Sequence, residues 1–195
     1  MTYTVGVFIG SLSSTSINRR LAGALMKLAP EGASFTEIGF GDLPLYRPEM
    51  DADYPPPAKA FKDAIAKVDA LLFVTPEYNR SIPGALKNAI DFASRPYGQN
   101  SFSRKPSAVI GTSPGAIGTA LAQQHLRTLL AYCNSPQLGA MEAYIQYKDG
   151  MIDDSGNVTV ESTREFLRKF MVEYDAFVRR VLTVIPKPDG GTAAS

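Results

Sequence analysis

The sequence predicts an α/β fold with one doubly wound, five-stranded parallel sheet of strand order 2-1-3-4-5 and with helices on both faces. Three observations lead to this prediction. Apolar runs of strand length alternate with helix-period segments five times along the chain. Most of these runs are apolar nearly throughout, which is typical of parallel strands buried on both faces. Five such units in 195 residues suit a doubly wound sheet.

The first half of the chain contains three expected strands. Residues 3–9 and 70–75 are apolar nearly throughout, whereas residues 35–40 mix polar and apolar side chains, as an edge strand would. Leucines recur on one stripe of the segment after the first strand, which indicates a helix. A proline-punctuated segment, 41–57, is expected to be a long loop. The expected helices of this half are residues 17–28 and 58–68.

The second half continues the same alternation. The segment PSAVIGT, residues 106–112, is an expected fourth strand, and a fifth lies at about residues 138–147. The last helix carries an aromatic stripe with helical spacing, which we interpret as core packing or a subunit contact. The expected helices of this half are residues 84–94, 119–132 and 161–182. We expect residues 1–185 to form a single domain and residues 186–195, PKPDGGTAAS, to be a flexible tail.

The composition excludes several classes of function. Lys plus Arg is 20 and Asp plus Glu is 19, so the near balance argues against nucleic-acid or anionic-membrane binding. One cysteine and one histidine cannot build a Cys/His zinc site, and no metal is expected. No apolar run approaches the length of a membrane span, and no signal peptide is evident, so we expect a cytoplasmic soluble protein.

Topology directs attention to the loops after the first, third and fourth strands, because the crevice of a 2-1-3-4-5 sheet lies at those carboxyl ends. The first loop, GSLSSTSIN at residues 10–18, has five hydroxyl side chains among the eight residues 11–18 and leads into a helix. A helix start offers free N–H groups to an anion. A simple N-cap explains Ser16 but not the other hydroxyls. No phosphate-binding lysine motif and no G-x-G-x-x-G follows the strand, so a lone phosphate monoester fits best.

Each of the other two loops can be interpreted either as a ligand-binding loop or as an ordinary turn. Residues 75–92, TPEYNRSIPGALKNAIDF, contain prolines that stiffen the backbone, either to present it to a planar heterocycle or to form an ordinary turn. Residues 111–118, GTSPGAIG, contain three glycines, which permit either close approach to a ligand or a tight turn into the next helix. Their expected neighbourhood in the sheet favours the ligand-binding interpretation.

Together these segments resemble the NADPH-dependent FMN reductase family, the flavodoxin-like group that includes bacterial quinone and chromate reductases. The matching pieces are GSL and SIN in the first loop, TPEYN with SIPG and LKNAIDF in the second, and TS with IG in the third. The resemblance covers about residues 5–147. The second motif is long and specific, whereas the other two are short.

The resemblance implies an FMN site made by all three loops. Loop one would hold the phosphate through side chains and backbone amides, loop two would border the isoalloxazine, and loop three would contact the flavin. The implied residues are Ser11, Leu12, Ser13, Ser16, Ile17, Asn18, Pro76, Glu77, Tyr78, Asn79 and Ser113. Relatives often carry a basic residue where this chain has Ser13 or Ser14, and loss of that charge would weaken FMN binding. Arg19, Arg20 and Arg80 are the candidates to compensate.

The resemblance also implies an activity. FMN would take hydride from NADPH or NADH and pass electrons to a small acceptor in a ping-pong cycle, with no catalytic side chain required. The implied acceptors are quinones, free flavins, chromate and azo compounds. Similar proteins are homodimers or homotetramers. His125 and Cys133 are expected to be structural, and Glu77 is expected to be a hydrogen-bond acceptor rather than a proton donor.

Three alternatives remain open at this stage. A flavodoxin-like electron carrier would have the same fold, although such carriers tend to be strongly acidic and this chain has a net charge of +1. A receiver-type switch would need paired acidic residues after the first strand, where this chain has Gly10 and Ser11. An enzyme that reduces free flavin as a substrate is not separated from a quinone reductase by the sequence.

Overall fold

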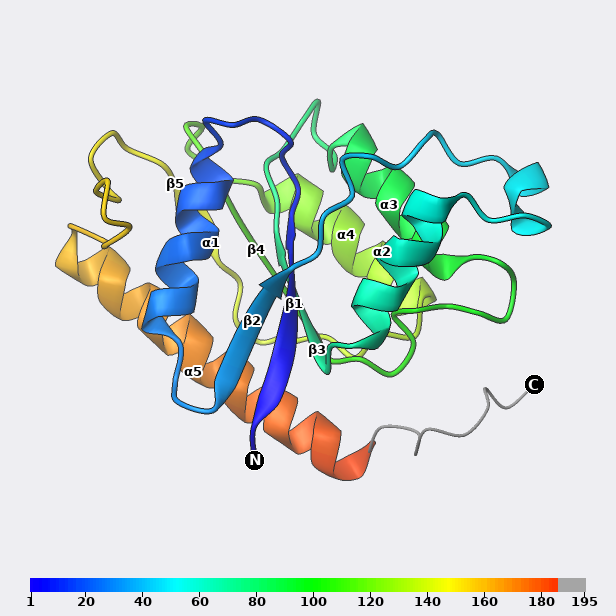
Figure 1. Ribbon diagram of the computed structural model, residues 1–195. Helices are drawn as coiled ribbons and strands as arrows, with labels where there is room; N and C mark the ends of the chain where they lie inside the picture. The colour runs from blue at the N-terminus through cyan, green and yellow to red at the C-terminus, as the bar shows by residue number, and fades with distance from the viewer. Residues whose placement is uncertain (186–195) are drawn as a thin grey trace.

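The computed structural model describes residues 1–185 and contains a five-stranded sheet of order β2-β1-β3-β4-β5 (Figure 1). Each neighbouring pair of strands is parallel. The predicted fold class and strand order are therefore confirmed. The strands are β1 Tyr3–Ile9, β2 Ala33–Glu37, β3 Ala70–Val74, β4 Ser107–Ser113 and β5 Tyr144–Gln146.

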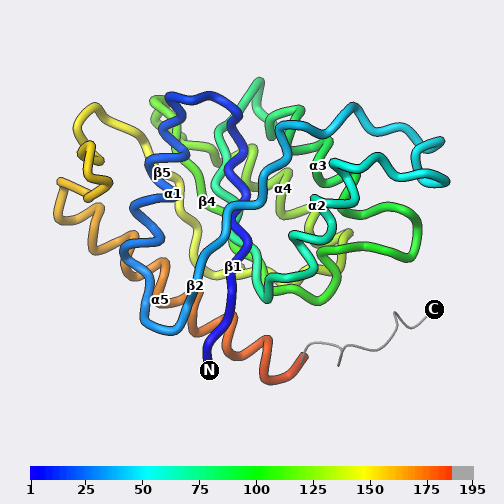
Figure 2. Tube along the Cα trace, in the orientation of Figure 1, coloured from blue at the N-terminus to red at the C-terminus, as the bar shows by residue number. Residues whose placement is uncertain are grey.

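Helices cover both faces of the sheet, so that two cores are formed. On one face α1 and α5 pack against the strands, and on the other face lie α2, α3 and α4 (Figures 1 and 2). The central strands β3 and β4 are buried on both sides, which explains why their sequences are continuously apolar. The helices are α1 Ile17–Leu28, α2 Pro56–Ala66, α3 Gly84–Ser94, α4 Ala120–Tyr132 and α5 Glu161–Val184.

Two expected strands have different bounds in the structure. The second begins at Ala33 and ends at Glu37, because the last ladder bond to β1 is donated by Ile38 N–H to the Val7 carbonyl, at 2.9 Å. The fifth is only three residues long, Tyr144–Gln146. Upstream of it, Leu138 N–H bonds to Ser107 O and the chain then leaves the sheet. The apolar residues of the expected strand 138–147 could not show that the chain leaves the sheet within it.

The structure also shows the expected loop 41–57 and the last helix. The loop 41–57 contains a short 3-10 helix, Pro48–Asp51, which was not predicted because the segment is rich in proline. The aromatic stripe of α5 packs into the core, where Phe170 and Tyr174 are buried and the Tyr174 hydroxyl donates to the Leu71 carbonyl at 2.8 Å. The expected tail at 186–195 lies outside the described residues.

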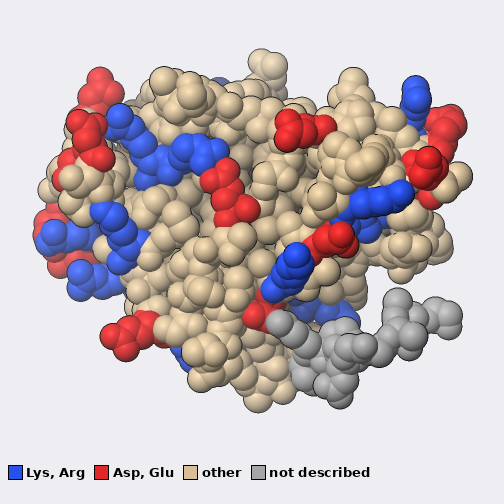
Figure 3. All heavy atoms as spheres, viewed as in Figure 1, with Lys and Arg blue, Asp and Glu red and all other residues tan. Residues whose placement is uncertain are grey.

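Charged side chains of both signs are interleaved on the face shown in Figure 3. On α1, Arg19 makes a bidentate pair with Glu37 of β2, at 2.6 and 2.9 Å. Arg20 lies 3.6 Å from Asp154, whose side chain is almost fully exposed. This face therefore carries paired charges rather than a field of one sign.

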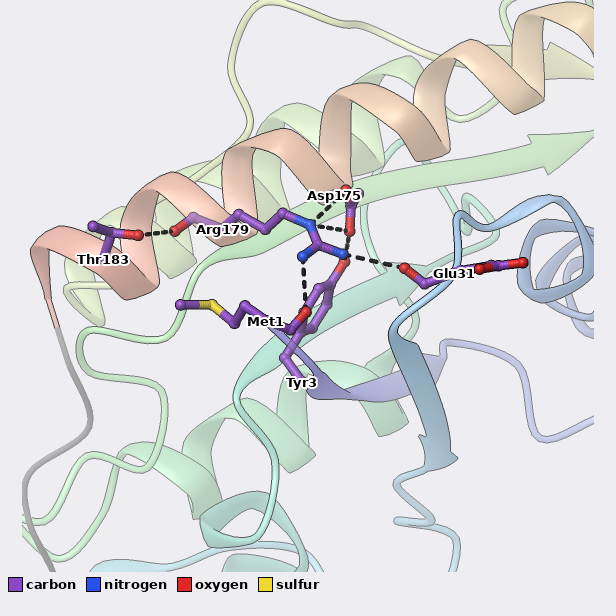
Figure 4. Close-up of polar contacts among 6 residues, drawn as sticks. All are labelled: Met1, Tyr3, Glu31, Asp175, Arg179 and Thr183. Carbon is purple, nitrogen blue, oxygen red and sulfur yellow. Dashed lines mark hydrogen bonds and ion pairs between the residues drawn. The ribbon is translucent and has the colours of Figure 1, made fainter.

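A polar clasp holds α5 to the amino-terminal end of the sheet (Figure 4). Asp175 accepts hydrogen bonds from the Tyr3 hydroxyl, at 2.7 Å, and from Arg179 Nε, at 2.8 Å. The Arg179 guanidinium also donates to the carbonyl oxygens of Met1, at 2.7 Å, and Glu31, at 3.2 Å. Burial opposes ionisation of Asp175, but the bonds from Arg179 and Tyr3 outweigh it and hold its pKa below the usual range.

We expect Asp175→Asn to destabilise the protein at pH 7 by about 1–2 kcal/mol, because charge-assisted hydrogen bonds are replaced by neutral ones. A carboxylate whose pKa is lowered by folding stabilises the native state above its unfolded pKa, and this contribution is lost as the pH falls through the folded pKa. Urea unfolding at pH 7 and at pH 3 should therefore show a difference between wild type and variant that shrinks in acid.

The matched control is Asp154→Asn, which removes a carboxylate from an exposed ion pair. We expect it to change the free energy of unfolding by less than about 0.5 kcal/mol at either pH. Equal effects of the two substitutions would contradict the role of the clasp.

Candidate functional site

Three loops meet at the carboxyl ends of β1, β3 and β4, at one edge of the sheet (Figure 1). Gly10 N–H bonds to Val74 O at 2.8 Å, and Thr75 N–H bonds to Ile110 O at 3.0 Å. A Cβ at position 10 would lie 2.6 Å from Thr75 Oγ1, and one at position 111 would overlap the Thr75 carbonyl. Glycine is therefore required at both positions, and the three loops lie side by side as predicted.

Loop one is folded by its own hydroxyls. Ser16 is the N-cap of α1, and its Oγ accepts a hydrogen bond from Arg19 N–H at 3.3 Å. Ser13 N–H bonds to the buried Ser11 Oγ, and Thr15 N–H bonds to Ser13 Oγ, both at 3.3 Å. Ser13 Oγ also lies 3.2 Å from Thr15 Oγ1. Side-chain bonds of this kind compete with regular structure and hold a tight turn before a helix.

The same loop leaves donors available for a ligand. Within residues 1–185 the N–H groups of Leu12, Ser14, Ile17 and Asn18 have no hydrogen-bond partner. The first turn of α1 contains no acidic residue, and Ser13 is exposed. Free N–H groups, exposed hydroxyls and the positive end of a helix dipole suit an anion. The residues present therefore fit the phosphate group of FMN.

Asn18 is placed differently from the other predicted phosphate ligands. Its side chain is buried, its Nδ2 donates to Thr112 O, and its Oδ1 accepts from Thr112 N–H, both at 2.9 Å. The carboxamide thus bonds α1 to the end of β4. Only its backbone N–H is left for a ligand, so the side chain positions loops one and three relative to each other.

Loop two contains a tight hairpin turn, shortly after the end of β3. Tyr78 and Ser81 exchange backbone hydrogen bonds at 2.9 Å in each direction. The central residues Asn79 and Arg80 both have positive φ, 51° and 64°, as in a type I′ turn. Asn tolerates this conformation, whereas Arg is strained in it. The turn leaves the Tyr78 side chain about half exposed, at 52%, on the rim of the site.

Two contacts join loop two to α4. The Glu77 carboxylate accepts hydrogen bonds from Leu121 and Ala122 N–H, and it pairs with Arg80 at 3.2 Å. Ser81 Oγ lies 2.9 Å from His125 Nδ1. Glu77 is thus a hydrogen-bond acceptor, as expected, and His125 contacts the loop from the helix. Sequence reasoning missed these partners, because the Leu121 and Ala122 amides carry no side-chain signal, and Ser81 and His125 are 44 residues apart in the sequence.

Loop three is held closely against β5. The Ser113 hydroxyl donates to the Gly118 carbonyl at 2.5 Å, within its own loop. Gly118 has φ of 59°, and a Cβ there would lie 2.9 Å from Ile145 N. The Ser113 oxygen can still accept a hydrogen bond from a ligand. Loop three is therefore prefolded next to loop one.

The three arginines proposed to replace a missing basic residue already have acidic partners. Arg19 pairs with Glu37, Arg20 with Asp154 and Arg80 with Glu77. The donors that remain available at the start of α1 are therefore hydroxyl and amide groups. In the described part of the chain, no group of three or more acidic, His or Cys side chains is arranged to hold a metal ion. None of its helices is long and apolar enough to cross a membrane.

Comparisons with known proteins agree with this geometry. The chain matches the NADPH-dependent FMN reductase family over residues 3–149. It is 51% identical over 179 residues to a 2-hydroxy-1,4-benzoquinone reductase of a Burkholderia species, covering 92% of this chain and 98% of that relative. It is 46% identical to a quinone reductase of Pseudomonas putida, covering 91% and 95%. The solved structure of a flavoenzyme NAD(P)H:(acceptor) oxidoreductase from Paracoccus denitrificans has a TM-score of 0.88 at 45% identity, covering 92% and 98%.

The doubly wound sheet of order β2-β1-β3-β4-β5, with three loops meeting at its switch point, defines a flavodoxin-like α/β protein. The chain belongs to the NADPH-dependent FMN reductase family. It is an FMN-dependent NAD(P)H oxidoreductase, and the resemblance read from the three loops is confirmed. The matched residues 3–149 include every residue of those loops.

We expect Asn18→Ala to destabilise the protein by about 2–4 kcal/mol, because two buried backbone groups of Thr112 lose their partners. Asn88→Ala is the matched control. Asn88 also bonds two backbone groups, Tyr46 N–H and Pro44 O, but at a more exposed position where water can replace it. Urea unfolding of the two variants should show the larger loss for Asn18. A larger loss for Asn88 would contradict the role assigned to the hydrogen bonds between Asn18 and Thr112.

Proposed function

We propose that this protein is a quinone reductase that holds FMN at the three-loop site and takes electrons from NADPH or NADH. The observation that carries the proposal is the open start of α1, where free N–H groups and exposed hydroxyls offer a phosphate site without a lysine. Two relatives that match nearly the whole chain are named as a benzoquinone reductase and a quinone reductase, which supports a quinone as the acceptor.

Bound FMN supplies the chemistry, by accepting hydride from a reduced nicotinamide and passing electrons to an acceptor. The chain supplies position. Ser11, Ser13 and Ser16, with the amides of Leu12 and Ile17, bind the phosphate. The backbone of Pro76, Glu77 and Asn79 borders the ring system, with Tyr78 on its rim, and Ser113 contacts it from loop three. Asn18 keeps loops one and three in register through Thr112.

The proposal includes a homodimer or homotetramer that works in the cytoplasm. Several large apolar side chains are exposed around the three loops and on the adjoining turn of α4. They are Leu12, Tyr78, Ile117 and Leu121. Exposed apolar side chains near the three loops favour contact with a second subunit next to the site. We expect no nucleic-acid or membrane partner, since the net charge is +1.

An absorption spectrum tests the proposal directly. The protein is incubated with excess FMN, desalted, and mixed anaerobically with NADPH or NADH, and then with benzoquinone. We expect retained flavin that bleaches within seconds and recovers its colour with the quinone. Retained flavin that neither nicotinamide bleaches would favour an electron carrier. Absence of retained flavin together with nicotinamide oxidation only in the presence of added FMN would favour flavin as a substrate.

The absence of a basic side chain in loop one gives a second prediction. We expect Ser14→Arg to lower the dissociation constant of FMN by at least about tenfold, because a charge-assisted hydrogen bond to the phosphate is gained. Riboflavin, which lacks the phosphate, should bind equally to wild type and variant. Titration of flavin fluorescence measures both constants.

Thr183→Arg is the control for this substitution. It adds the same charge in the last turn of α5, near the end of the sheet opposite the three loops. We expect no change in FMN affinity. Equal gains for Ser14→Arg and Thr183→Arg, or a gain that riboflavin shares, would contradict binding of the phosphate at loop one.

A further inference from the structure

The start of α4 lacks a cap of its own. Its N-cap residue, Thr119, makes no side-chain capping bond. The Thr119 hydroxyl instead accepts a hydrogen bond from Gln123 Nε2 at 3.0 Å, inside the core. The N–H groups at the second and third helical positions, Leu121 and Ala122, are the ones that an N-cap side chain normally satisfies.

Glu77 of loop two supplies this cap from 44 residues away in the sequence. Its Oε2 accepts hydrogen bonds from Leu121 N–H at 3.0 Å and from Ala122 N–H at 3.1 Å. Its side chain is only 7% exposed, and Oε1 pairs with Arg80 at 3.2 Å. One buried carboxylate therefore faces two sources of positive potential, the helix dipole and a guanidinium.

The cap also holds the turn that follows it. The strained hairpin turn consists of Tyr78, Asn79, Arg80 and Ser81, and its two central residues have positive φ. The Glu77 carboxylate fixes one end of that turn to α4, and the Ser81–His125 contact fixes the other. A backbone in a costly conformation persists only where neighbouring contacts impose it.

We infer that Glu77 is a positioning residue which fixes loop two on α4. We infer also that it sets the electrostatic potential where loop two borders the flavin ring system. This inference rests on the proposed placement of FMN against loop two. At this place the Glu77 carboxylate offsets the positive potential of the α4 helix start and of the Arg80 side chain. Loss of its charge leaves that potential uncompensated and favours a reduced, more negative flavin.

The experiment compares Glu77→Gln, Arg80→Gln and the double variant. Glutamine keeps the size of Glu77 and one acceptor oxygen, so the fold is retained. We expect the FMN midpoint potential to become more positive in Glu77→Gln, more negative in Arg80→Gln, and close to wild type in the double variant. Opposite shifts that cancel indicate charge, whereas a purely structural defect shifts both single variants alike.

Glu161→Gln is the matched control. Glu161 lies in the first turn of α5 and also pairs with an arginine three residues later, Arg164, but away from the three loops. We expect it to leave the potential unchanged. Salt should reduce the shift caused by Arg80→Gln more than that caused by Glu77→Gln, since the Arg80 side chain is 66% exposed.

Hydrogen exchange in the protein without FMN tests separately whether Glu77 holds loop two on α4. The amides of Tyr78 and Ser81 should exchange faster in Glu77→Gln than in wild type and in Glu161→Gln. Unchanged exchange, or an unchanged potential in protein that binds FMN, overturns the inference. Wild-type protein that binds no FMN would refute the proposed function instead, and the exchange rates would still decide whether Glu77 clamps the loop.

Discussion

The close packing of three backbone segments around Thr75 is the constraint on which the rest of the site depends. Glycines at positions 10 and 111 allow the ends of β1 and β4 to approach the end of β3 closely, and any side chain there would meet Thr75. The buried carboxamide of Asn18 then bonds to Thr112 at the end of β4. Because the strand ends are closely packed and the Asn18 hydrogen bonds join two of the loops, the relative positions of the loops have little freedom.

Two helix starts at this edge of the sheet are used in opposite ways. The start of α1 has free N–H groups and no acidic residue in its first turn, so it is open to an anion. The start of α4 is filled by the Glu77 carboxylate. The potential at the start of α1 therefore favours an anion, whereas the Glu77 charge disfavours one at the start of α4. Because Arg19, Arg20 and Arg80 are each paired with an acidic side chain, the donors that remain at the start of α1 are hydroxyl and amide groups.

The two ends of the sheet differ in what their polar contacts accomplish. At the amino-terminal end, the Tyr3–Asp175–Arg179 clasp joins a hydroxyl, a carboxylate and a guanidinium to one another and to backbone carbonyls (Figure 4). At the carboxyl end, Ser13 N–H and Thr15 N–H bond to the Ser11 and Ser13 hydroxyls at 3.3 Å, and Ser13 and Thr15 remain exposed. The contacts that hold α5 thus lie at one end of the sheet, and the three loops lie at the other, where open parallel sheets usually bind ligands.

The sequence by itself determined the sheet order, the positions of most helices and strands, the three loops and the family. Apolar periodicity reports burial, and glycine, proline and hydroxyl residues report local backbone needs, so these features could be read directly. The tertiary structure alone decided that β5 is short, that Asn18 binds Thr112 and that Glu77 caps α4. The last two contacts span 94 and 44 residues and end on backbone groups. Because every residue except proline carries the same backbone N–H and C=O, no side-chain pattern could reveal them.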